Sequence, residues 1–379
     1  MADAVYVSTS GVPHCDVADL QAIRGGKGWD PGDPAGINDH WRDTINATMN
    51  AIAAENPDAV FHTGDMVMGF WGRDVDNTGI FGPDDTLEQR KRMAWNAANC
   101  YYGETKRFWA DAGIPSTQIH YAPGDHEMGD VDTDGHVPTT NFAYQAHAEY
   151  YDAWARNFTA SGNKYSRHPR GQHAKSAYAV TLPGNCLLIS LDPCDRQDTG
   201  LHYRISDRQL DWAVNQATSF KTGGGRWVFV QCEVPTKGRN RHRNSSRTYL
   251  HNRHAVWQAM IDADIDLFLA AEFHDTTAHS NGFRRPLHIV HGGGLAYNYS
   301  AYLVITVFAG RLELQAKQAF NTVTDRSLRL WQLDDRQRPP RKPNPARFAT
   351  FGTAVLHADG ELSDRTGQLR EGPGSDRAE

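Results

Sequence analysis

The sequence has no stretch of about 18 consecutive apolar residues, which a membrane-spanning helix would need. Its first residues, MADAVYVSTSG, lack the basic segment and apolar run of a secretory leader, so we expect a cytoplasmic protein without a membrane partner. Cysteines are few, odd in number and without CxxC spacing, which favours reduced thiols over a disulfide framework. They are Cys15, Cys100, Cys186, Cys194 and Cys232.

The chain also lacks the basic excess of a general nucleic-acid binder. It has 39 Lys and Arg against 45 Asp and Glu, a net charge of −6. We therefore expect nucleic acid to be at most a substrate. The 39% hydrophobic content is that of a folded globular chain. Its 18 histidines favour an enzyme, because imidazole is the usual proton shuttle and metal ligand.

Apolar periodicity predicts an α/β fold. Residues 4–8 and 58–62 are short apolar strands, and residues 39–55 between them carry apolar side chains on one helical face. Residues 226–232 and 265–271 are continuous apolar runs, typical of strands buried on both faces. Ser206, with Gln209 three residues later, predicts a capping box at the start of a helix over 206–220.

Composition divides the chain near residue 333. We expect one domain over 1–333, followed by a Pro- and Arg-rich arm over 334–358. Residues 359–379 are polar and nearly free of large apolar side chains, which predicts a disordered tail.

Carboxylates and imidazoles recur just after the predicted strands, where ligands gather in open α/β sheets. Two carboxylates about 4 Å apart repel each other by about 4 kcal/mol at an effective dielectric constant near 20. Several of them at one place therefore predict a bound divalent cation. The residues concerned are Asp65, Asp125, His126, Glu233, Glu272 and His274.

The order of these motifs resembles the calcineurin-like metallophosphoesterases, in particular their purple acid phosphatase-like branch. HTGD (62–65), GDHE (124–127), CEVP (232–235) and AEFH (271–274) follow in the family's order, and the resemblance covers about residues 4–320. It implies a four-layer α/β sandwich, with two mixed sheets flanked by helices. It also implies metal-dependent hydrolysis of phosphate monoesters or diesters, with His126 as the acid that protonates the leaving oxygen.

Several positions depart from the family pattern. Thr9 and Gly11 stand where the family has a metal-binding Asp and His, and Met68 stands where the purple acid phosphatases have Tyr. Asp125, Glu233 and Glu272 replace Asn and two His. Together with Asp65, they form an all-oxygen donor set, which favours Mg²⁺, Mn²⁺ or Ca²⁺, with iron possible.

We therefore predict one metal ion rather than two, with Asp65, Asp125, Glu233, Glu272 and His274 as its ligands. His14 or Asp16 could still fill the first-motif position. The alternatives are a catalytically silent binding protein on this fold, or an enzyme with an altered single-metal reaction.

A basic stretch at 237–254 directly follows the Glu233 motif. One arginine side chain can bind two phosphate oxygens at once, so this stretch fits a phosphorylated small molecule or another polyanionic substrate. A solvated surface loop is the alternative interpretation. The candidate substrate-binding residues are Arg239, Arg241, His242 and Arg243.

Overall fold

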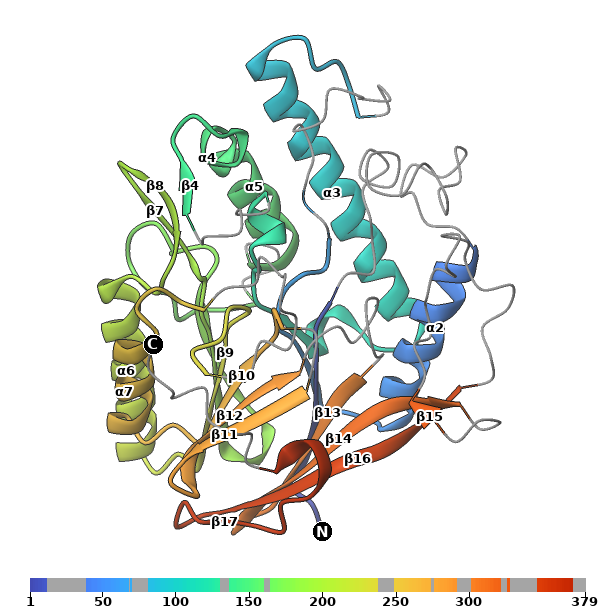
Figure 1. Ribbon diagram of the computed structural model, residues 1–379, viewed down its shortest axis with the longest axis vertical. Coiled ribbons are helices and arrows are strands. Elements are labelled where there is room, and N and C mark those ends of the chain that lie inside the picture. Colours follow the sequence, from blue (N-terminus) through green and yellow to red (C-terminus); the bar gives the residue numbers. More distant parts are fainter. Residues whose placement is uncertain are drawn as a thin grey trace.

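The computed structural model contains two main β-sheets, a small third sheet and helices on both outer sides (Figure 1). It describes residues 1–11, 39–67, 69, 81–129, 136–159, 164–237, 249–273, 276–291, 301–321, 326–327 and 346–370.

The larger sheet has eight strands in the order β17-β16-β14-β13-β1-β2-β3, with β15 also paired to β14. Strands β1, β2 and β3 are parallel, so their carboxyl ends lie at the same edge. The strands are β1 (Ala4–Thr9), β2 (Ala59–His62), β3 (Ile119–Tyr121), β13 (Ala301–Val307), β14 (Arg311–Asn321), β15 (Arg326–Ser327), β16 (Ala346–His357) and β17 (Leu362–Ser363).

The second sheet has six strands in the order β11-β12-β10-β9-β6-β5. Strands β6, β9, β10 and β12 are parallel, and β5 and β11 are antiparallel at the two edges. The strands are β5 (Tyr178–Leu182), β6 (Cys186–Ser190), β9 (Trp227–Gln231), β10 (Leu267–Ala270), β11 (Thr276–Asn281) and β12 (Arg284–His291).

A small antiparallel sheet, β4-β8-β7, lies apart from the two main sheets. Its strands are β4 (His136–Pro138), β7 (Cys194–Gln197) and β8 (Gly200–Tyr203). The α-helices are α2 (Asp39–Ala54), α3 (Leu87–Asp111), α4 (Phe142–Gln145), α5 (His147–Trp154), α6 (Asp207–Thr222) and α7 (Arg253–Asp262).

The two main sheets pack face to face through a buried aromatic layer. Tyr6 of β1, Phe61 of β2 and Phe229 of β9 contact one another, with ring centroids 5.2–6.1 Å apart. Alternate residues such as Val7 and Val60 point to the other face, where they join the core beneath the helices. Figure 1 shows α6 and α7 on the outer side of the six-stranded sheet, and α2 and α3 on the opposite side of the molecule.

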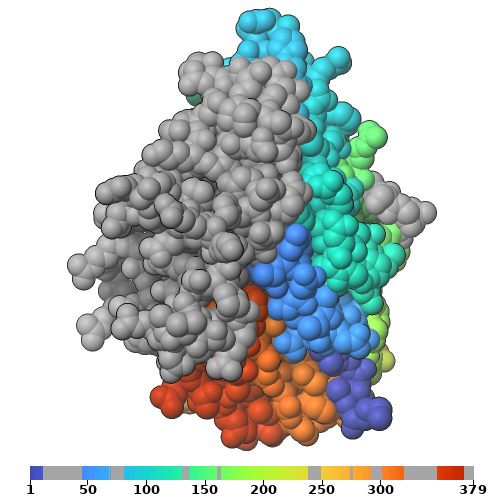
Figure 2. All heavy atoms as spheres, turned by 90° about the vertical axis from the view of Figure 1, so that its right-hand side faces the viewer, coloured from blue at the N-terminus to red at the C-terminus, as the bar shows by residue number. Residues whose placement is uncertain are grey.

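Figure 2 shows α2 and the C-terminal half of α3 next to each other above the strands of the C-terminal half. The predicted four-layer α/β sandwich is confirmed, and the predicted strands and helices of residues 1–320 that lie in the described part of the chain form. No helix in that part is both long and apolar enough to cross a membrane.

The predicted capping box at Ser206 is wrong. Ser206 is the N-cap of α6, but its side chain makes no capping hydrogen bond. The Gln209 amide is buried and instead accepts from the backbone N–H of Asp192 and donates to its carbonyl. The capping box lies at α3, where Thr86 and Gln89 bond each other's backbone N–H groups.

The C-terminal segments differ from the sequence-based expectation. Residues 346–357, which we expected in an extended arm, form β16 and pair along the full length of β14. Residues 359–370 are ordered as well, with β17 paired to β16 and Leu369 fully buried. The alternation of buried Ala354 and Leu356 with less buried neighbours explains the strand, because one apolar face suffices in an antiparallel sheet. Residues 371–379 lie outside the described part of the chain.

Candidate metal centre

Four carboxylates converge at the carboxyl ends of four parallel strands. Asp65 follows β2 and Asp125 follows β3 in the larger sheet, whereas Glu233 follows β9 and Glu272 follows β10 in the six-stranded sheet. One carboxylate oxygen from each of the four lies within 4.8 Å of the others. The site therefore joins the two sheets, and the sequence correctly predicted that these four residues lie together.

The backbone around the site is tight. Asp65 and Glu272 adopt left-handed conformations, with φ angles of 59° and 56°, which non-glycine residues rarely do. Gly124 leaves room for Asp65, because a Cβ atom at Gly124 would lie only 2.5 Å from Asp65 Oδ1. Gly64 similarly leaves room for the Glu233 side chain. Both glycines of the Gly-Asp motifs thus permit the close approach of the two loops.

The four carboxylates are buried, with exposed fractions between 0% for Glu233 and 7% for Glu272. Asp65 Oδ1, Asp125 Oδ1 and both oxygens of Glu233 have no hydrogen-bond partner among the described residues. Burial raises the pKa of Asp65 well above its usual range, and the neighbouring Asp125 raises it further. Burial does the same to Glu233, assisted by Asp65 and Asp125.

These properties fit a bound cation. Buried charges are normally paired or bound to metal, and unpaired oxygens at one point would otherwise leave a large desolvation penalty. The donors are all oxygens, which suits a hard divalent ion better than zinc. Asp65, Asp125, Glu233 and Glu272 form one group of described residues that could hold such an ion, and Asp65, Asp125 and His126 form another.

Glu127 holds two of the ligand loops together, a role that the sequence did not reveal. Its side chain is fully buried and accepts hydrogen bonds from the backbone N–H groups of Asp65, Met66 and Gly124 at 2.9, 2.5 and 2.6 Å. Burial raises the pKa of Glu127 to about 7, although these three hydrogen bonds act in the opposite direction. Only the position of Glu127 in GDHE could have indicated this role.

His126 lies beside the carboxylates, and one of its ring nitrogens is within 4.8 Å of oxygens of Asp65 and Asp125. It is only partly buried, unlike its neighbour Glu127. This position is compatible with proton donation to a bound substrate, as well as with a direct contact to an ion.

Hydrogen bonds between the two main sheets hold the carboxyl end of β1 in place, and the sequence did not predict them. Ser8 Oγ lies 2.7 Å from His291 Nε2, and Ser10 Oγ donates to the His291 carbonyl at 2.8 Å. Thr9, at the position of the family's first Asp, is buried, and its hydroxyl has no hydrogen-bond partner among the described residues. The strand end is thus fixed by hydrogen bonds of the residues that flank Thr9.

Several predicted residues lie outside the described part of the chain. They are the ligand His274, the substrate-binding Arg239, Arg241, His242 and Arg243, the alternative ligands His14 and Asp16, and Met68.

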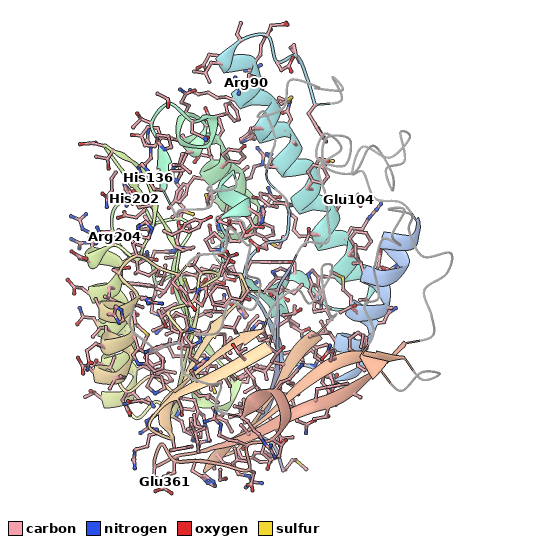
Figure 3. All side chains as sticks on the ribbon, in the orientation of Figure 1. Arg90, Glu104, His136, His202, Arg204 and Glu361 are labelled. Carbon is pink, nitrogen blue, oxygen red and sulfur yellow. The ribbon has the colours of Figure 1, made fainter. Side chains whose placement is uncertain are left out.

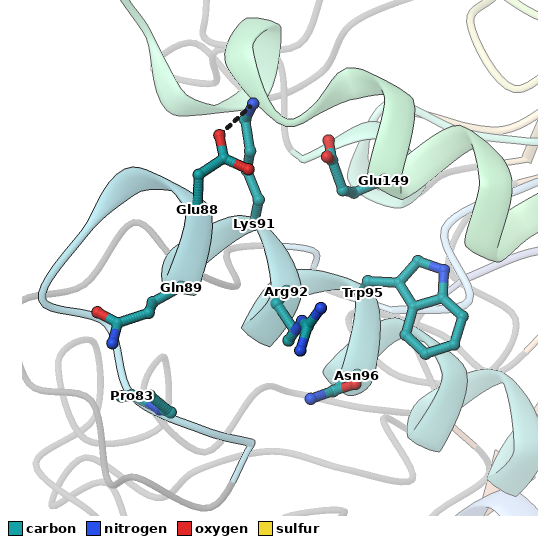
Figure 4. Close-up of a pocket in the computed structure, with 8 residues that line it drawn as sticks. All are labelled: Pro83, Glu88, Gln89, Lys91, Arg92, Trp95, Asn96 and Glu149. Carbon is teal, nitrogen blue, oxygen red and sulfur yellow. Dashed lines mark hydrogen bonds and ion pairs between the residues drawn. The ribbon is translucent and has the colours of Figure 1, made fainter.

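A cavity of about 880 Å³ lies elsewhere, along α3 (Figure 4). Its described lining includes Arg92 and Trp95 from α3 and Glu149 from α5. None of the four clustered carboxylates lines it, so it is separate from the candidate metal centre.

No protein-family model matches the sequence. No curated protein matches it either. Solved structures do match: PhoD has a TM-score of 0.57 and 14% identity, over 99% of this chain and 73% of that chain. A dimetal phosphatase from Danio rerio has a TM-score of 0.49 and 12% identity, over 83% of this chain and 96% of that chain.

The similarity to PhoD supports a metallophosphoesterase-like fold for this chain. At this level of identity it concerns the fold alone. The purple acid phosphatase-like branch stays a prediction.

Proposed function

We propose that this protein is a metal-dependent hydrolase of phosphate monoesters or diesters, divergent from the purple acid phosphatase-like branch and with a single-ion site. The observation that carries the proposal is the set of four buried carboxylates at the carboxyl edges of both sheets, whose oxygens lie close together. Oxygens of Asp65, Asp125 and Glu233 have no hydrogen-bond partner among the described residues. The fold, which is similar to that of PhoD, is consistent with this proposal.

Asp65, Asp125, Glu233 and Glu272 hold the ion in this proposal, and His274 completes the set. Such an ion, Mg²⁺, Mn²⁺, Ca²⁺ or iron, supplies Lewis-acid polarisation of a phosphoryl oxygen. His126 stands beside two of these carboxylates and donates the proton to the leaving oxygen. Arg239, Arg241, His242 and Arg243 bind phosphate oxygens of a phosphorylated small molecule or another polyanion.

Two alternatives share this fold. The first is a catalytically silent protein that binds a partner, favoured by Thr9 and Gly11 in place of the family's first two ligands. The second is an enzyme with a different single-metal reaction. The position of His126 next to Asp65 and Asp125 favours hydrolysis over the silent protein.

The test combines metal analysis with turnover. The purified chain is loaded with Mg²⁺, Mn²⁺, Ca²⁺ or Fe²⁺, and its hydrolysis of p-nitrophenyl phosphate and bis(p-nitrophenyl) phosphate is measured. We expect His126→Ala to lower kcat by about 10²–10⁴-fold while the ion stays bound. Glu233→Gln is expected to lose both the ion and turnover. Glu88→Gln, on exposed α3 surface, is the control that keeps both.

Tight ion binding without turnover of either ester would overturn the hydrolase in favour of the silent protein. Unchanged turnover in His126→Ala would show that His126 is not the acid that protonates the leaving oxygen. If the unchanged chain binds two equivalents of Mn²⁺ and Glu233→Gln binds neither, the site holds two ions rather than one.

A further inference from the structure

Three histidines cluster on the small sheet, apart from the four carboxylates. His136 is on β4, His202 is on β8, and His251 lies in the segment before α7. We propose that these three imidazoles form a second metal site, which takes a borderline transition ion of the Zn²⁺ or Cu²⁺ class. The ion would link three segments that are far apart in the sequence.

The first two rings are already placed as a pair. His136 and His202 are direct partners across the antiparallel β4–β8 pair, so their side chains leave the same face of the sheet. Their ring centroids are 4.6 Å apart. Two imidazoles bound to one ion at about 2.0–2.1 Å have centroids about 4.5–5.2 Å apart, so the spacing of this pair is that of two ligands of one ion. Figure 3 shows the two residues next to each other in the upper left part of the molecule.

The third ring is close, and its backbone is fixed. The His202 and His251 centroids are 6.3 Å apart, about 1 Å more than two ligands of one ion require. The His251 backbone N–H donates to the Tyr203 carbonyl at 2.7 Å, next to His202 in the chain. Asn252 makes two further hydrogen bonds with the backbone of Ile205. The proposal therefore requires the exposed His251 side chain to rotate about its side-chain bonds when the ion binds.

Thr199 orients both rings of the pair. Its hydroxyl lies 3.0 Å from His202 Nε2, and its carbonyl accepts from His136 Nε2 at 3.4 Å. The carbonyl can only accept, so His136 carries its proton on Nε2 and its Nδ1 lone pair faces away from Thr199. His202 has the same arrangement when its Nε2 donates to the Thr199 hydroxyl, and metal-bound histidines are usually held in this way by their other nitrogen. Gly200 gives the His136 ring its space, because a Cβ atom there would lie 2.8 Å from His136 Nε2.

The charges and donor atoms around the pair suit a transition ion. The nearby cation, Arg204, is paired with Asp207 at 2.9 Å and with Asp195 at 3.6 Å. Three nitrogen donors suit Zn²⁺ and Cu²⁺ rather than Mg²⁺ or Ca²⁺, so this site and the carboxylate site should select different ions.

The test is a titration of the full chain with Cu²⁺, followed by electron paramagnetic resonance, and with Zn²⁺, followed by calorimetry. We expect one equivalent of Cu²⁺ with nitrogen hyperfine structure. His136→Ala and His202→Asn should weaken binding by more than about 100-fold, because even outer-shell partners of metal ligands are worth about 10–100-fold. His202→Asn retains an amide that can bond Thr199, so it separates ligand loss from misfolding.

Two controls define the site. His357→Ala removes a histidine of β16 and should leave Cu²⁺ binding unchanged. Glu233→Gln alters the carboxylate site, and it should leave the nitrogen signal unchanged while Mn²⁺ binding is lost. A Cu²⁺ signal without nitrogen ligands, or unchanged affinity in both His136→Ala and His202→Asn, would overturn the proposal without affecting the proposed hydrolase.

Discussion

The Glu127 carboxylate accepts a hydrogen bond from the backbone N–H of Asp65 at 2.9 Å, although 62 positions separate the two residues. The same carboxylate binds the N–H groups of Met66 and Gly124, so one side chain fixes the loops that carry two of the proposed ligands. The geometry of the proposed ion site therefore depends on a residue that contributes no ligand atom to the four-carboxylate set.

Removal of this carboxylate should loosen both loops. Glu127→Ala leaves three buried N–H groups without their acceptor, and each such group costs about 1–3 kcal/mol. We expect a loss of several kcal/mol in the free energy of unfolding, measured in urea, and weaker Mn²⁺ binding. Glu127→Gln keeps one acceptor oxygen, so its free energy of unfolding should lie between those of Glu127→Ala and the unchanged chain. Equal stability of Glu127→Ala and the unchanged chain would contradict this role.

Glu233→Gln should stabilise the fold in the absence of a divalent ion, and Mn²⁺ should cancel or reverse this difference. Without a divalent ion, Glu233→Gln removes a buried carboxyl that Asp65 and Asp125 repel, and we expect the free energy of unfolding to rise by about 1–3 kcal/mol. Mn²⁺ at 100 times its Kd should stabilise the unchanged chain by about 2.7 kcal/mol and the variant hardly at all. Thermal melts with EDTA or Mn²⁺ measure both effects. Glu361→Gln, at the lower end of the molecule in Figure 3, is the control.

His173 should make stability depend on alkaline pH. Burial alone would lower its pKa, but the hydrogen bond that it makes to Asp192 and the negative charges of Asp192 and Asp195 outweigh burial and raise the pKa to about 9. A raised histidine pKa stabilises the fold fully below the unfolded value near 6.5, and this contribution disappears as the pH rises through about 9.

The check is the difference in unfolding free energy between the unchanged chain and His173→Gln. That difference should be largest near pH 6 and shrink by about 3 kcal/mol by pH 9.5. His254→Gln, on the exposed side of α7, should show no such change. A difference that does not vary with pH would mean that His173 is not charged in the fold.

Two helix N-caps offer a matched comparison. Thr86→Ala should destabilise the fold by about 1 kcal/mol, because the Thr86 hydroxyl accepts from the Gln89 backbone N–H. Ser206→Ala should cost less than about 0.5 kcal/mol, because the Ser206 side chain makes no capping bond. Urea unfolding of both variants measures the difference, and a larger loss at Ser206 would contradict the assignment of the caps.

The same two caps show where sequence patterns succeed and fail. Apolar spacing predicted α2 and the buried strands, since periodicity is local and follows the backbone geometry. Ser206 and Gln209 matched a capping pattern, but tertiary packing placed the Gln209 amide on the Asp192 backbone instead. The sequence cannot show which of two competing partners a buried amide meets.

The candidate site also has features that the sequence predicts and features that it does not. The convergence of Asp65, Asp125, Glu233 and Glu272 was predictable, because the carboxyl ends of parallel strands meet at one edge. The contacts of Glu127 and of His291 with Ser8 were not predictable, since each joins segments that only the folded chain brings together.

Strand β16 also determines where the chain can be shortened. Its pairing covers all 11 residues of β14, so a protein ending at residue 333 would leave this long edge of β14 without a partner strand. Exposed edges of this length recruit other chains through their free backbone groups. We therefore expect the C-terminal segment to protect β14 from pairing with other copies of the chain. The shortest fragment that stays monomeric should extend beyond β16, past the change in composition near residue 333.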